Sequence, residues 1–88
     1  MQDHPHTAIA LRLKRANGHL EKIIEMIEGG RPCAQIAQHL QAVEGAIESA
    51  KKALIHDHIS HSIEDSLKLS GAKGRAVLKD FRLIAKYL

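Results

Sequence analysis

The residues best suited to chemistry are one cysteine and a group of histidines at opposite ends of one apolar stripe. Cys33 stands three residues before Ile36, and His58 and His61 follow Leu54 by four and seven residues. Steps of three and four keep residues on one face of a helix, so the thiol and the imidazoles continue the stripe. Cysteine with histidine is a borderline-soft ligand set that suits zinc, nickel, cobalt or copper ions. The pattern indicates a site that captures a metal ion or a small electrophile.

Further ligands for such a site are available near the N-terminus. His4 and His6 could each add an imidazole if the first helix packs alongside the second. The competing interpretation is structural, because a lone cysteine on an apolar stripe is usually a small buried hydrophobe. Histidines at the end of a helix or of a chain are likewise often only solvated. The spacing of Cys33 and His58, given below, favours a site over this alternative.

Two helices with the same apolar period must position these residues. The first ends at Gly29-Gly30, a helix stop. The second begins near Pro32 and runs for about 30 residues, because no breaker interrupts the period before Gly71; its length is typical of coiled-coil-like packing with another chain. The first stripe comprises Ile9, Leu13, Ala16, Leu20, Ile23 and Ile27, and the second comprises Ile36, Leu40, Val43, Ile47, Ala50 and Leu54.

A short third helix follows the Gly-Ala-Lys-Gly segment at 71–74, which we expect to separate it from the second. This helix places Val77, Phe81, Ile84 and Leu88 on one face. No segment has the alternating pattern of a strand. We therefore expect an all-α fold of three helices with a long central helix, forming one domain over residues 1–88.

The distance between Cys33 and His58 predicts a site shared by two chains. They are 25 positions apart, which is roughly 37 Å along a continuous helix. In an antiparallel pair of these helices that cross near residues 45 and 46, Cys33 of one chain lies beside His58 of the other. Two-fold symmetry then creates two equivalent sites.

Composition restricts the class of protein. The chain has 88 residues, a single cysteine and a formal net charge of +3. A lone thiol suits a reducing compartment, and neither a signal peptide nor an apolar run of about 18 residues is visible. We expect a cytoplasmic protein that does not bind membranes. Phosphate loops, HExxH and nucleophile-elbow motifs are missing, so we do not expect an enzyme.

A basic stripe on the first helix points weakly to nucleic acid. Arg12, Arg15, His19 and Lys22 recur at steps of three and four along one polar face. Such a stripe is, by itself, more typical of a solvated face. His19 and His39 lie off the apolar stripes, and we interpret them as surface or packing residues.

Four segments carry a resemblance to a known family that covers nearly the whole chain. The sequence resembles the CsoR/RcnR family of small helical repressors, which includes the FrmR type, and it is most similar to the NreA/DmeR branch through its His-Pro-His at 4–6 and its closing Ala-Lys-Tyr-Leu. The segments are Leu-Lys-Arg-Ala-Asn-Gly-His-Leu at 13–20, Gly-Arg-Pro-Cys at 30–33, Gln-Ala-Val-Glu at 41–44 and Leu-Ile-His-Asp-His-Ile-Ser-His at 54–61.

The resemblance implies an assembly and a function. Antiparallel dimers would form a four-helix-bundle core and pair into a disc-shaped homotetramer that binds double-stranded operator DNA without a helix-turn-helix. An inducer bound at the shared site would lower the affinity of the tetramer for DNA. The residues that fall where family members present DNA-binding charge are Arg12, Lys14 and Arg15 on the first helix and Lys52 on the second.

The sequence leaves more than one hypothesis for the identity of the inducer. Copper sensors of this family place a second cysteine four residues after the site histidine, where this chain has Ser62. We therefore expect Ni(II) or Co(II), with Zn(II) as a further candidate, bound by Cys33 and His58 with His61, His4 or His6. Formaldehyde trapped at Cys33 is a second hypothesis, although Pro5 is internal and offers no terminal amine. A metal-binding helical protein without a DNA role is the third.

Overall fold

Three helices make up the part of the chain that the structure describes. The computed structural model describes residues 6–68 and 72–88, and the side chains at 62 and 64–73 lie outside the description. The helices are α1 (Thr7–Glu28), α2 (Cys33–Lys68) and α3 (Ala72–Ala85). The all-α fold with a long central helix is thus confirmed, and α2 at 36 residues is even longer than predicted.

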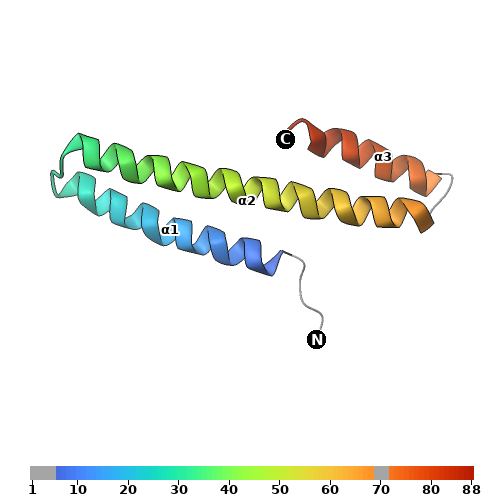
Figure 1. Ribbon diagram of the computed structural model, residues 1–88, viewed down its shortest axis with the longest axis horizontal. Coiled ribbons are helices and arrows are strands. Elements are labelled where there is room, and N and C mark those ends of the chain that lie inside the picture. The colour runs from blue at the N-terminus through green and yellow to red at the C-terminus, as the bar shows by residue number, and fades with distance from the viewer. Residues whose placement is uncertain (1–5, 69–71) are drawn as a thin grey trace. The chain divides into compact units, whose positions relative to one another are not determined.

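Two compact units divide the chain, Met1–Lys51 and Lys52–Leu88. The first contains α1 and the beginning of α2, which run side by side, and the second contains the remainder of α2 with α3 beside it (Figure 1). Each unit is described by itself below. A single domain over residues 1–88 stays a prediction.

The connection between α1 and α2 is a Schellman motif. The backbone N–H of Arg31 donates to the carbonyl of Met26 at 3.0 Å, and that of Gly30 donates to the carbonyl of Ile27 at 3.1 Å. Gly30 has φ of 70°, a left-handed conformation that glycine adopts without steric cost. The predicted stop at Gly29-Gly30 is therefore confirmed. Pro32 precedes α2 and accepts the first hydrogen bonds from its backbone, from Gln35 and Ile36.

The core of the first unit uses alternate members of the predicted stripes. Ile9, Ala16 and Ile23, seven residues apart, are buried on α1, and Val43 and Ala50 are buried on α2. Ile23 is only 1% exposed, which makes it the centre of this contact. The intervening members remain exposed in the single chain, namely Leu13, Leu20, Ile27, Leu40 and Ile47. We call these five residues the exposed apolar face.

The second unit corrects two details of the prediction. Ile55 is 1% exposed, whereas the predicted stripe residue Leu54 is 38% exposed. Ile55 stands one turn before His58, which contacts α3, so α3 covers the Ile55 side of α2. Gly74 was expected to separate the helices, but it lies inside α3. It occupies the first turn, where backbone N–H groups lack helical partners in any case, so the helix tolerates it.

The apolar face predicted for the third helix is confirmed in part, and its last residue lies outside the helix. Val77 and Ile84 are half-buried as expected, but α3 ends at Ala85 and Leu88 lies beyond it. Pro5 falls outside the described residues. Among the described helices, none is long and apolar enough to cross a membrane.

Candidate functional site

Cys33 lies at the very start of α2 and is exposed. Its thiol forms no disulfide. The expectation that Cys33 continues a buried stripe is therefore wrong for the single chain, because none of the elements that the structure describes covers the N-terminus of α2. An exposed thiol is open to a metal ion, to an electrophile or to a second chain.

His58 is held by an acidic residue that the sequence did not point to. Its Nε2 contacts Oδ2 of Asp80 on α3, within the second unit. A carboxylate can only accept, so Nε2 carries the proton and donates it. In the neutral ring this leaves Nδ1 with its lone pair available for a metal ion. Carboxylates that orient a histidine in this way are common partners of metal-binding imidazoles.

His61 offers the opposite nitrogen. Its Nδ1 donates to the backbone carbonyl of Asp57 at 2.8 Å, so Nε2 is left as the ligand atom of the neutral ring. His56, by contrast, points away with its side chain 83% exposed. His6 is half-buried just before α1, and His4 falls outside the described residues.

In the described part of the chain, no group of three or more His, Cys, Asp and Glu residues comes together to hold a metal ion. The donor atoms nevertheless fit a borderline-soft cation, because Cys33 offers a thiol and His58 and His61 each keep one nitrogen open. The shared set of Cys33, His58, His61, His4 and His6 stays a prediction that requires a second chain.

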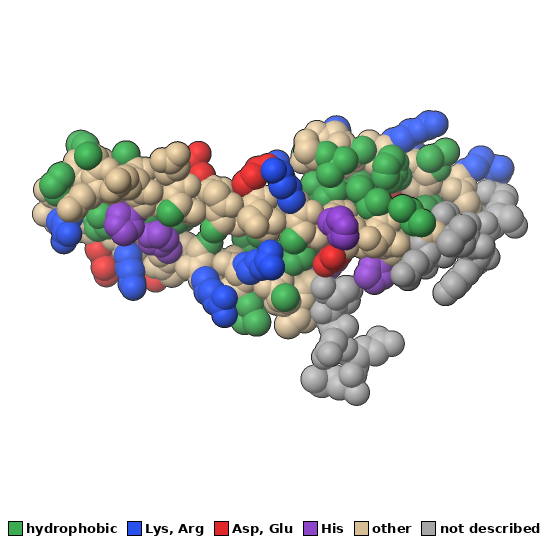
Figure 2. Space-filling model, in the orientation of Figure 1, with side chains coloured by type: hydrophobic (Ala, Val, Ile, Leu, Met, Phe, Trp, Pro, Cys, Tyr) green, Lys and Arg blue, Asp and Glu red, His purple; other side chains and the backbone are tan. Residues whose placement is uncertain are grey.

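The predicted basic stripe lines a groove between α1 and α2. Arg12 and Arg15 share an opening of about 400 Å³ with His19 on α1 and with Ala46 and Ser49 on α2. Figure 2 shows Lys and Arg side chains spaced along α1. Lys14 is exposed in the same unit, and Lys52 is exposed at the beginning of the second unit. The first unit thus presents the charge expected of a polyanion-binding surface.

A smaller, apolar groove also lies between α1 and α2. Leu13 and Leu20 on α1 and Ile47 on α2 line it, together with Ala16, and its volume is about 160 Å³. Ala16 lines both this groove and the basic one, so it separates them. The exposed apolar face and the basic stripe therefore occupy different sides of the α1–α2 pair.

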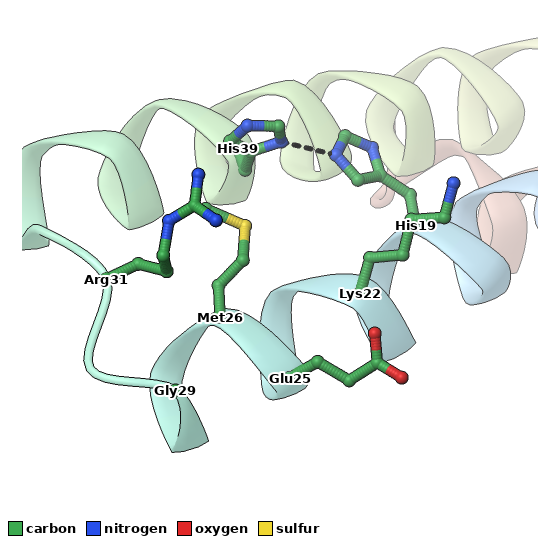
Figure 3. Close-up of a pocket in the computed structure, with 7 residues that line it drawn as sticks. All are labelled: His19, Lys22, Glu25, Met26, Gly29, Arg31 and His39. Atoms are coloured by element: carbon green, nitrogen blue, oxygen red, sulfur yellow. Dashed lines mark hydrogen bonds between the residues drawn. The ribbon is translucent and has the colours of Figure 1, made fainter.

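Sequence reasoning missed a contact between two histidines. His19 and His39, interpreted above as surface or packing residues, face each other across α1 and α2, with Nε2 of His19 2.8 Å from Nδ1 of His39. They border an open groove of about 690 Å³ (Figure 3). They are 20 positions apart and both lie outside the apolar stripes, so no periodic signal in the sequence would pair them.

Comparison with known proteins defines the class. Residues 6–85 match the family described as metal-sensitive transcriptional repressor. The chain therefore belongs to this family, which is the CsoR/RcnR family that the sequence resembles. The NreA/DmeR branch stays a prediction.

Individual relatives agree with the family. A copper-sensing transcriptional repressor CsoR of Bacillus subtilis is 32% identical over 79 residues, which are 90% of this chain and 77% of that protein. A CsoR of Mycobacterium ulcerans is 40% identical over 48 residues, 54% of this chain but only 41% of that protein. The copper-sensing repressor RicR of Mycobacterium tuberculosis is 31% identical over 62 residues, 70% of this chain and 65% of that protein. No solved structure matches the chain.

Proposed function

We propose that this protein is an operator-binding repressor that releases DNA when a metal ion joins Cys33 of one subunit to His58 of the partner subunit. The observation that carries the proposal is the contact of His58 with Asp80, which fixes the proton on Nε2 and leaves Nδ1 as a ligand atom. An imidazole oriented by a carboxylate is prepared for a metal ion.

The exposed apolar face supports the second chain that this site needs. Its members recur every seven residues on each helix, the period of helices that pack with a partner. Burying it against the same face of another copy would form an antiparallel dimer with a four-helix core. The basic stripe lies on a different side and would stay open to DNA. Two such dimers would form the tetramer.

The basic residues supply the contact with the operator. Arg12, Lys14 and Arg15 on α1, with Lys52 on α2, would neutralise backbone phosphates. Coupling to the metal would pass through α3, because the same imidazole that binds the ion donates to Asp80 on that helix. Metal that weakens DNA binding must itself bind less tightly to the DNA complex, by the same factor.

For the inducer we propose Ni(II) or Co(II), with Zn(II) as a further candidate. One cysteine and several imidazoles form a ligand set of intermediate softness, with His61, His4 and His6 available to complete it. Cu(I) favours soft sulfur ligands, and Ser62 stands where a second thiolate would be needed. Copper is still the leading rival, because the relatives named above are copper-sensing repressors.

A competition titration tests the proposal. A labelled duplex from upstream of the gene for this chain is bound to the protein, and Ni(II), Co(II), Zn(II), Cu(I) and formaldehyde are added separately while fluorescence anisotropy is followed. We expect Ni(II) or Co(II) to release the duplex at the lowest free concentration. Cys33→Ala should bind the duplex as before and fail to release it, and His56→Gln, which removes an exposed imidazole, should respond like the unmodified protein.

Other outcomes would contradict parts of this account. If Cu(I) alone releases the duplex, the proposed metal is wrong. If formaldehyde releases the duplex and leaves a one-carbon adduct on the exposed Cys33 thiol, the inducer is formaldehyde and not a metal ion. If metal still releases the duplex from the Cys33→Ala protein, Cys33 is not part of the site. A protein that binds metal but no duplex would be a metal-binding helical protein without a DNA role.

A further inference from the structure

The His19–His39 pair lies in a groove that two cationic side chains also line. Its two rings are nearly perpendicular, at 84°, with centroids 5.1 Å apart, and both belong to the first unit. Lys22 on α1 and Arg31 in the connection line the same groove, and Glu25 is its acidic member. Figure 3 shows the rings meeting between α1 and α2, with Arg31 reaching toward α2.

This groove continues the basic stripe. His19 also lines the neighbouring groove that holds Arg12 and Arg15. Figure 2 shows two adjacent histidine side chains at the connection end of α1 and α2, with Lys and Arg side chains on either side along α1. A polyanion that follows α1 from Arg12 would therefore meet the histidine pair and then Lys22 and Arg31.

The number of protons on the two rings determines how many hydrogen bonds the pair can donate to an anion. The hydrogen bond between the rings uses one nitrogen of each and one proton. In the neutral pair, one of the two outer nitrogens, Nδ1 of His19 or Nε2 of His39, has no proton. Adding a single proton makes both outer nitrogens donors, keeps the bond between the rings, and gives the pair one positive charge. Histidine is the side chain whose charge changes near neutral pH, so a dependence of binding on pH is the property to measure.

We propose that the groove of His19, His39, Lys22 and Arg31 binds a phosphate of the operator backbone, and that this binding takes up one proton per histidine pair. The inference rests on the proposed DNA-binding function and adds to it a further phosphate contact and a dependence on pH. The charged groups around the pair are Arg12, Arg15, Lys22 and Arg31 on the cationic side and Glu25 on the anionic side. The balance is cationic, so it favours an anion over a cation.

A divalent metal chelated by the two rings is the rival use of this pair. It would need the proton between the rings to leave, and among the described residues no third His, Cys, Asp or Glu completes a group that could hold the ion. Lys22 and Arg31 would repel a cation from the groove. We therefore argue for the phosphate and make the metal an outcome of the test.

The first experiment measures affinity for the same duplex between pH 8 and pH 6 at constant ionic strength. Affinity of the unmodified protein should rise as pH falls, by at most about tenfold per pH unit for each engaged pair. The double variant His19→Gln with His39→Gln should lose that part of the rise, and His56→Gln, the same change at an exposed imidazole, should keep it. Equal pH slopes in all three proteins would overturn the inference.

The second experiment identifies the ligand and keeps the two proposals separate. Histidine side-chain NMR signals are followed while duplex, inorganic phosphate or Zn(II) is added. Shifts of His19 and His39 with the duplex alone indicate a backbone phosphate, and shifts with inorganic phosphate as well indicate a general phosphate site. Shifts with Zn(II) only would overturn the inference in favour of a metal. Duplex binding with the pair unaffected would leave the repressor function intact and remove only this inference, whereas no duplex binding at any pH would remove the function itself.

Discussion

At the level of single residues, Asp80 orients the imidazole of His58. It accepts a hydrogen bond from Nε2–H of His58 on α2, which leaves Nδ1 as the nitrogen that would bind the proposed metal ion. Asp80→Asn should weaken metal binding by about tenfold to a hundredfold, the usual cost of removing the carboxylate behind a ligand histidine. Competition with a chelating dye measures this. Glu44→Gln removes an exposed acid of α2 and is the matched control, whose metal affinity should not change.

Of the histidine hydrogen bonds described above, those of His58 and His19 could not be predicted from the sequence. His61 bonds to the carbonyl one helical turn earlier, a local contact that helical period allows. His58 meets Asp80 across 22 residues and His19 meets His39 across 20. Such pairs depend on how two helices rotate against each other, and neither Asp80 nor His39 stands out by type or spacing. The candidate ligands Cys33, His58 and His61 were visible because they extend an apolar period.

At the level of elements, the Schellman motif between α1 and α2 gives a paired prediction. Gly30→Ala should lower the free energy of unfolding by about 1–2 kcal/mol, because φ of 70° is unfavourable for alanine. Gly18→Ala, inside α1 with nothing within 4 Å of the added Cβ, should raise it by about 0.5–1 kcal/mol. Chemical denaturation measures both. A gain of stability at residue 30 would mean that the connection does not need this conformation.

The helices themselves could be read from sequence, and their faces only in part. The period of the apolar residues and the glycines at 29 and 30 fix α1 and the beginning of α2. The same period could not distinguish Leu54 from Ile55, because the face that is buried there depends on where α3 packs. Gly74 was misjudged for a related reason, since a glycine in a first turn and a glycine in a loop look alike in sequence.

At the level of the whole molecule, the exposed apolar face predicts association. Leu20 is 38% and Ile47 is 48% exposed in the single chain, and both line the apolar groove. Ile47→Glu should shift the protein toward monomers in sedimentation and, with them, abolish high-affinity metal binding. Leu11→Glu places the same charge at an exposed apolar residue outside this face and should leave the assembly intact. An Ile47→Glu protein that still associates would show that another surface joins the chains.

The most direct test of the account mixes two inactive variants. Cys33→Ala and His58→Ala each destroy both shared sites of a homodimer, but a mixed dimer keeps one complete site, with Cys33 from one chain and His58 from the other. After the two proteins are unfolded together and refolded at equal concentrations, the thiolate-to-metal absorption with Co(II) should recover to about a quarter of the unmodified value, since half of the dimers are mixed and each holds one of two sites. Neither variant alone should show it. Absorption that stays absent after mixing, or that either variant shows by itself, would contradict a site shared between subunits.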